Sequence, residues 1–261
     1  MPMPPRRRPL LALGASLARR GPAVIVAIVV SVLTALGAAI VGFVLARRGA
    51  EAPVYDVPLL ASSALAWGGG FLHAFSASAG ALRRDRTDGI RDLVVTRTTS
   101  LNGYLFGRTA GLALVLVAVV GGGTLFTGLA AMAGAAGVGV GRTLQATLAA
   151  CAFAIAFGLV LAPVSLATLG ARARTAGWAL IVVVLFVPEL LVWSMHDTFP
   201  TEVTELLAIP SALSALRASL APGSVEPLRF ARALVALAVF TGIALVFLRR
   251  DAALLEREGD A

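Results

Sequence analysis

Lysine is absent from this chain of 261 residues, and cysteine occurs once, as Cys151. Without lysine the chain can form neither a phosphate-binding loop of the GxxxxGK[ST] type nor a lysine Schiff base. A lone cysteine forms no internal disulfide and no multi-cysteine metal site, so we expect Cys151 to be a small core residue. Motifs of the HExxH, CxxC and GxSxG types are also absent from the sequence. We therefore expect no catalytic residue and no metal site in this chain.

Charge is scarce as well. Only 14% of the residues are charged, 58% are hydrophobic, and the mean hydropathy is +0.89. This composition lies outside the range of soluble domains and predicts an all-α integral membrane protein. Runs of about 20 apolar residues predict six transmembrane helices within one domain, 1–261. The predicted spans are 22–46, 57–82, 105–132, 144–169, 175–195 and 231–248.

The arginines predict the orientation of these spans. When both termini are assigned to the cytoplasm, 16 of the 22 arginines lie on the inner side, as the positive-inside rule requires. The net charge of +8 is therefore a signal for topology in a plasma or bacterial inner membrane, and we expect no nucleic-acid partner. The arginines left at the outer side are Arg47, Arg48, Arg142, Arg217, Arg229 and Arg232.

The segment 1–21 is basic and contains several leucines after Pro9. Its apolar run is interrupted by Gly14 and closed by Arg19 and Arg20, which argues against a cleaved signal peptide. We expect a short interfacial helix on the inner membrane surface, with its arginines among anionic lipid headgroups. The alternative is a basic tail that only sets the topology.

Ionisable residues inside the predicted spans are candidates for function, and two of them stand out. They are His73 in the second span and Glu189 in the fifth, and both are candidates for a translocation path. His73 and His196 together raise haem ligation as a hypothesis, although His196 lies at the end of a span and His73 near the middle of one. Glycine clusters in the spans predict close helix packing, with movement during gating as the alternative.

The segment 197–229 is the longest predicted outer connection. Its pieces 201–208 and 211–220 are amphipathic, and Ile209 with Pro210 is expected to separate them. Ser211 is the expected N-cap of the second piece. This pattern predicts a broken extracellular hairpin that dips toward the membrane or covers the outer mouth, with plain surface helices as the alternative.

The inner loop 83–104 connects the second and third spans. Within it, 89–96 predicts a short amphipathic helix with Asp88 as its N-cap. A helix of this length does not persist alone in water and needs a surface to pack on. The loop is therefore expected to dock on a partner.

The loop begins with Arg84, Asp85 and Arg86 and continues through Gly89 and Asp92 to an apolar run, and Gly107 with Arg108 follows at the start of the third span. This motif and the predicted topology together resemble the permease subunits of ABC-2 type transporters, which have the type V exporter fold. Members of that family tend to read R-E-R-E-x-G-T-L-E-x-L-L-x-T-P in this loop, followed by Gly-Lys at the start of the third span. Arg97 stands where proline is common, and Ile90 replaces threonine. The matching positions are Arg84, Asp85, Arg86, Gly89, Asp92, Leu93, Val94, Val95, Thr96, Gly107 and Arg108.

The resemblance implies that the chain is the membrane-spanning subunit of an ATP-driven exporter. It implies a second permease chain, identical or related, and a separate ATPase subunit that binds ATP and Mg²⁺, besides the membrane lipids around the chain. The loop would hold the coupling helix, and the implied contact residues are Asp85, Arg86, Asp88, Gly89, Arg91, Asp92 and Leu93. The resemblance does not identify the transported substrate. A different class also fits the composition, namely a haem-bearing subunit of a redox complex or a membrane scaffold.

Overall fold

The computed structural model describes residues 7–20, 22–48, 51–90, 92, 94, 100–134, 140–171, 174–195, 198, 200–223 and 225–257. All regular structure in these ranges is helical. In chain order the elements are α1 (Arg7–Ala18), α2 (Pro22–Arg47), α3 (Glu51–Leu65), η1 (Ala66–Gly70), α4 (Phe71–Ser78), α5 (Ala81–Thr87), α7 (Leu101–Gly134), α8 (Val140–Leu169), α9 (Arg174–Met195), α10 (Thr201–Thr204), α11 (Ile209–Ala218) and α12 (Pro227–Arg257).

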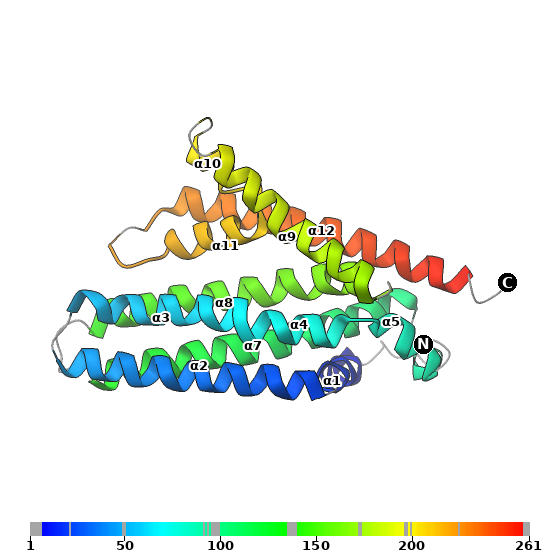
Figure 1. Ribbon diagram of the computed structural model, residues 1–261, viewed down its shortest axis with the longest axis horizontal. Coiled ribbons are helices and arrows are strands. Elements are labelled where there is room, and N and C mark those ends of the chain that lie inside the picture. The colour runs from blue at the N-terminus through cyan, green and yellow to red at the C-terminus, as the bar shows by residue number, and fades with distance from the viewer. Residues whose placement is uncertain are drawn as a thin grey trace, which may run out of the picture.

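Five helices, α2, α7, α8, α9 and α12, are long and apolar enough to cross a membrane. They confirm the all-helical class and indicate a multi-pass membrane protein. The predicted span 57–82 is not among them, because α3 and α4 are separated by the π-helical turn η1. The three pieces nevertheless follow one another and lie side by side with α2 (Figure 1).

The bundle is formed by α2, the α3–η1–α4 run, α7 and α8, which pack on one another, while α9 and α12 diverge from it (Figure 1). The central helix is α8, since 72% of its apolar span is buried against 17% for α9 and 22% for α12. The short helix α11 fills the wedge between α8 and the diverging pair, where it contacts α8, α9 and α12.

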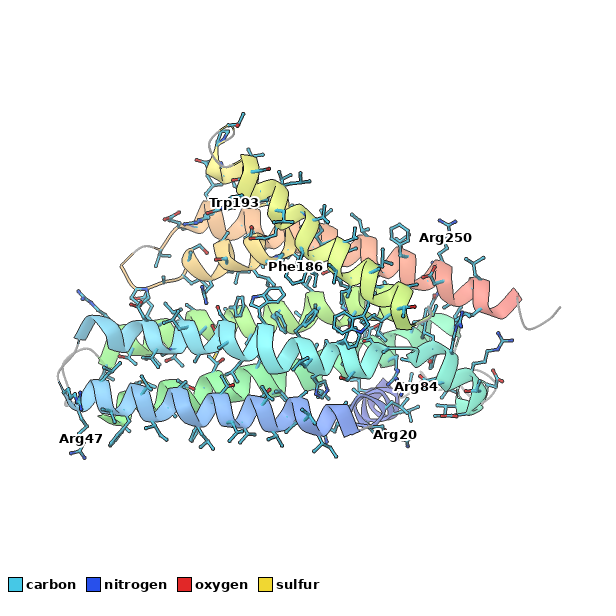
Figure 2. All side chains as sticks on the ribbon, in the orientation of Figure 1. Arg20, Arg47, Arg84, Phe186, Trp193 and Arg250 are labelled. Carbon is cyan, nitrogen blue, oxygen red and sulfur yellow. The ribbon has the colours of Figure 1, made fainter. Side chains whose placement is uncertain are left out.

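Arginines mark the two ends of the bundle, and apolar side chains cover the length between them (Figure 2). Arg47 lies at one end, called here the Arg47 end, while Arg84 and Arg250 lie at the opposite one, the Arg84 end. Large apolar side chains such as Trp193 on α9 are exposed between the ends. An apolar girdle with charged ends is the surface that a bilayer requires.

The segment predicted as a broken hairpin differs from the expectation in how its second helix begins. The four-residue helix α10 is followed by a turn, and α11 starts at Ile209 with Pro210 in its first turn. Proline at this place costs no hydrogen bond, because the first N–H groups of a helix have no intrahelical acceptor. The residues expected to break the helix therefore begin it. Ala208 occupies the N-cap position, and Ser211 is not the cap.

Helix α1 crosses the beginning of α7 at close range. A Cβ atom on Gly14 would lie 2.1 Å from the carbonyl oxygen of Gly107, and one on Gly111 would lie 2.4 Å from the amide nitrogen of Ala15. Only glycine allows two helix backbones to approach this closely. The helix expected to lie on the membrane surface is thus fixed to α7 by backbone contact.

The contact between α1 and α7 predicts unequal effects for two glycine substitutions within α7. Gly111→Ala should destabilise the protein by about 1–3 kcal/mol, because the new methyl group meets the α1 backbone. Gly122→Ala is the matched control, since no atom lies within 4 Å of its Cβ position. It should be neutral or stabilising by up to about 1 kcal/mol, because alanine favours the helix. Thermal unfolding in detergent micelles measures both, and equal melting temperatures would contradict the crossing.

Candidate functional site

The connection between α4 and α7 begins with a helix that the sequence did not predict, α5. Gly80 adopts φ +65°, a left-handed conformation that lets the chain leave α4 and start α5 at once. Asp88, the expected N-cap of the following helix, stands at the C-terminal end of α5 instead. Gly89 makes a second left-handed turn at φ +67°, and Ile90 after it is helical.

The expected helix 89–96 is described only in part. Asp92 and Val94 have helical conformation; Asp92 is exposed and Val94 is buried. Arg91 and Leu93, which the family resemblance implied as contact residues, lie outside the described residues. One exposed and one buried position are consistent with the amphipathic character expected of this helix.

The start of α5 is bonded to the end of α8. The Gly80 N–H donates to the Leu169 carbonyl at 3.0 Å, and the Leu82 N–H donates to the Gly170 carbonyl at 3.1 Å. Carbonyls at the C-terminal end of a helix have no intrahelical donor, so these two bonds satisfy groups that would otherwise need water. They attach the loop to the most buried helix of the bundle.

A buried ion pair attaches α5 to α7. Arg108 Nε lies 3.1 Å from Asp85 Oδ2, and the Tyr104 hydroxyl donates to the same oxygen at 2.6 Å. All three side chains are buried. Tyr104 and Arg108 are four residues apart and therefore share one face of α7. A charge removed from water is tolerated only when it is paired and hydrogen-bonded, so this cluster fixes α5 on α7.

A third contact joins the loop to α12. The Arg86 guanidinium donates to the carbonyl of Leu255, near the end of α12. Asp85 and Arg86, both implied as partner contacts, thus have bonds within the chain. The side chains of Arg83, Arg84, Asp88 and Asp92 are exposed. The loop therefore has a base bonded to α7, α8 and α12 and an exposed charged surface.

The intramembrane candidates His73 and Glu189 lie on different helices. His73, on α4, is fully buried, and neither ring nitrogen has a hydrogen-bond partner in the described part of the chain. Glu189, on α9, accepts a hydrogen bond from the Ser211 hydroxyl of α11 at 2.8 Å. His196, the second residue of the haem hypothesis, lies outside the described residues. No contact that the structure describes brings these candidates into one site.

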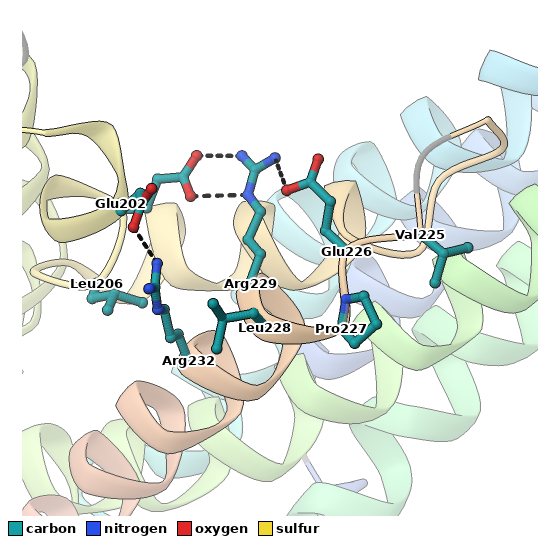
Figure 3. Close-up of a pocket in the computed structure, with 9 residues that line it drawn as sticks. Glu202, Leu206, Val225, Glu226, Pro227, Leu228, Arg229 and Arg232 are labelled. Carbon is teal, nitrogen blue, oxygen red and sulfur yellow. Dashed lines mark hydrogen bonds and ion pairs between the residues drawn. The ribbon is translucent and has the colours of Figure 1, made fainter.

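The sequence reasoning missed a polar cluster at the hairpin. Arg229 holds Glu205 through two parallel hydrogen bonds and lies 3.7 Å from Glu226, while Arg232 pairs with Glu202 (Figure 3). These residues line a cavity of about 570 Å³. The spacing contained a signal, because the two glutamates of the hairpin and the two arginines of α12 are each three apart, one helical turn. Their charges satisfy one another, so the cluster attaches the hairpin to α12.

No protein-family model and no curated protein sequence matches this chain.

Removal of one member of the Asp85 cluster should be costly. Asp85→Ala leaves Arg108 buried without a counterion, and we expect a loss of about 3–5 kcal/mol in the free energy of unfolding. The double variant Asp85→Asn/Arg108→Met should lose less, because no unpaired charge remains. Asp88→Asn, at an exposed position three residues away, is the control and should change stability by less than about 0.5 kcal/mol. Denaturant titration in micelles measures all three, and similar losses for Asp85→Ala and Asp88→Asn would refute the cluster.

Proposed function

We propose that this chain is the membrane-spanning subunit of an ATP-driven exporter of the ABC-2 type, and that the loop 83–104 docks on a separate ATPase subunit. One observation supports this most: the loop exposes charged residues on a base that is bonded to three long helices. A partner that moves this surface would move α7, α8 and α12 with it, because elements joined by buried ion pairs and backbone hydrogen bonds move together.

The proposal includes a sixth span made of α3, η1 and α4. At a rise of about 1.5 Å per residue, the 28 residues from Glu51 to Ser78 extend about 42 Å, which exceeds the hydrocarbon thickness of about 30 Å. Both termini and the loop 83–104 would then lie in the cytoplasm, at the Arg84 end, and the α10–α11 hairpin would enter the bundle from the outer side. The arginines favour this orientation in a plasma or bacterial inner membrane.

Energy would enter through the partner. ATP and Mg²⁺ would bind to the ATPase subunit, and closure of two such subunits would displace the loops of two paired permease chains. The segment after Gly89 would act as the coupling helix, with Asp88 and Asp92 among its contact residues. His73 and Glu189 remain candidates for the path of the substrate. Apolar spans favour an amphiphilic or lipid-like cargo.

Charge reversal in the exposed part of the loop tests the partner contact. Asp92→Arg should abolish co-purification of the ATPase subunit while the permease elutes from size-exclusion chromatography as the wild type does, because Asp92 is exposed. Arg250→Asp is the control; it reverses an exposed charge at the same end but outside the loop. Retention of the ATPase subunit by Asp92→Arg would refute the proposed docking surface.

Cysteine labelling tests the sixth span. In a Cys151→Ser background, Arg48→Cys should react with a membrane-impermeant maleimide in intact cells, whereas Thr87→Cys should react only after permeabilisation. The two positions flank the α3–η1–α4 run and are both exposed, so they lie on opposite sides only when that run crosses the membrane. Labelling of both positions from the same side would show that five helices, and not six, span the bilayer.

A further inference from the structure

Arg217, which the sequence placed at the outer side, reaches into the bundle. It projects from α11, and its Nη1 donates to the carbonyl of Leu59 at 2.6 Å and to the hydroxyl of Ser63, both on α3. Its guanidinium carbon lies 5.4 Å from the centroid of the Phe153 ring on α8. Arg217 thus joins the hairpin to α3 and α8.

The contacts of Arg217 lie far from the Arg47 end of these helices. Ser63 follows the first residue of α3 by twelve positions, a rise of about 18 Å. Phe153 follows the first residue of α8 by thirteen positions, about 20 Å along a helix of 30 residues. A guanidinium at this depth in an apolar bundle lies beyond the interface, where burial of a charge is expensive.

The charge of Arg217 has no carboxylate partner among the residues that the structure describes. A carbonyl, a hydroxyl and the face of an aromatic ring contact it instead. These groups offer partial negative charge, which offsets only part of the cost of removing a full charge from water. An anion beside the guanidinium would remove most of that cost.

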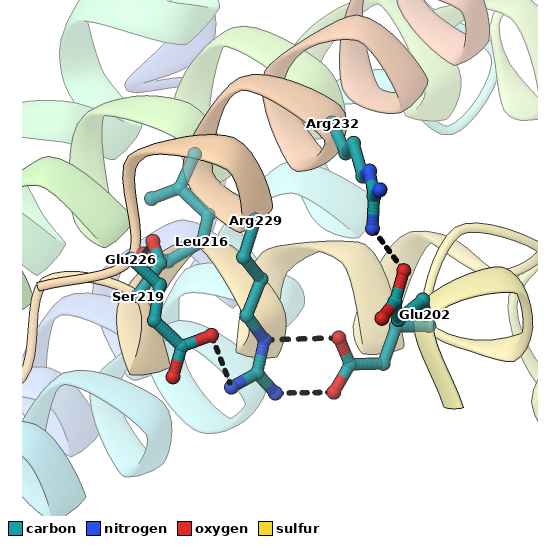
Figure 4. Close-up of polar contacts among 7 residues, drawn as sticks. Glu202, Leu216, Ser219, Glu226, Arg229 and Arg232 are labelled. Carbon is teal, nitrogen blue, oxygen red and sulfur yellow. Dashed lines mark hydrogen bonds and ion pairs between the residues drawn. The ribbon is translucent and has the colours of Figure 1, made fainter. Parts of the chain in front are cut away.

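One edge of the guanidinium is available for such an anion. Both bonds of Arg217 come from Nη1, and neither Nε nor Nη2 has an acceptor in the described ranges. Each of these two nitrogens keeps some exposed surface. The same two nitrogens of Arg229 hold the carboxylate of Glu205 through a pair of parallel bonds (Figure 4). The edge that Arg229 fills with a carboxylate is open in Arg217.

We propose that the Nε–Nη2 edge of Arg217 binds the anionic headgroup, a phosphate or a carboxylate, of an amphiphilic molecule. Two parallel bonds from a guanidinium match two oxygens of either group. Phe153 and Phe157 are fully buried and, with Trp67, form a filled aromatic cluster beside the guanidinium, so the apolar chain of such a molecule would extend away from that cluster. The inference rests on the position of α11 in the bundle and not on the ATPase partner, so either can fail without the other.

Binding of dodecyl phosphate to the full chain in dodecyl maltoside micelles tests the site. Isothermal titration calorimetry should show saturable binding to the wild type. Arg217→Gln should weaken that binding at least about tenfold, because it removes two charge-assisted hydrogen bonds. Arg217→Lys keeps the charge but cannot make the two-point contact, so it should also weaken binding. If Arg217→Gln does not fold, the affinity of Arg217→Lys tests the role of the guanidinium.

Two control variants separate the site from a purely structural role. Ser63→Ala removes one contact of Arg217 Nη1 but leaves the Nε–Nη2 edge in place. The affinity of this variant for dodecyl phosphate should therefore stay within about threefold of the wild-type affinity. That change is smaller than the one expected from the loss of one hydrogen bond to the headgroup. Arg48→Gln removes an exposed arginine at the Arg47 end and should change nothing. Wild-type affinity in both Arg217 variants, or absence of binding to the wild type, would overturn the proposal.

Two further probes identify the chemistry of the ligand. Dodecyltrimethylammonium carries the same chain with the opposite charge and should not compete with dodecyl phosphate. Inorganic phosphate should bind much more weakly, because it lacks the chain. Equal affinity for inorganic phosphate would overturn the assignment to an amphiphile, and competition by the cationic detergent would overturn the role of the anion.

Discussion

The ion pair between Asp85 and Arg108 is the interaction on which the arrangement of the Arg84 end depends. Both groups are buried, and a carboxylate and a guanidinium removed from water are stable only together. The pair forms only when α5 lies on α7, which fixes the position of the whole loop. Tyr104 completes the cluster on the same face of α7. The turn of α7 from Tyr104 to Arg108 thus fixes the position of the exposed charged surface of the loop.

Close backbone approach at glycine has a similar role along the length of the bundle. Between helices in lipid the hydrophobic effect gives little preference for one packing over another, so small residues that permit close contact decide it. A Cβ atom on Gly69 would lie 1.9 Å from Ser31 Oγ of α2, and one on Gly158 would lie 2.6 Å from Val117 of α7. These contacts favour packing over gating as the reason for glycine at these two positions.

The wedge helix α11 is held by polar contacts on two sides. Ser211 near its start bonds Glu189 of α9, and Arg217 near its end bonds α3. The preceding turn and α10 are attached to α12 through Glu205 and Glu202. A helix held in this way keeps α9 and α12 apart from the bundle at the Arg47 end.

The sequence by itself determined the all-helical class and the membrane location, because long apolar runs with few charges have no other stable form. It also located the loop and the hairpin, since charge and turn residues interrupt those runs. It did not determine that Asp85 pairs with Arg108 or that Arg217 reaches α3. Those contacts join residues far apart along the chain, and only the packing of the helices decides which charges meet. Helix α5 was missed for the same reason, because its seven residues are stabilised by α7, α8 and α12 and not by their own helical propensity.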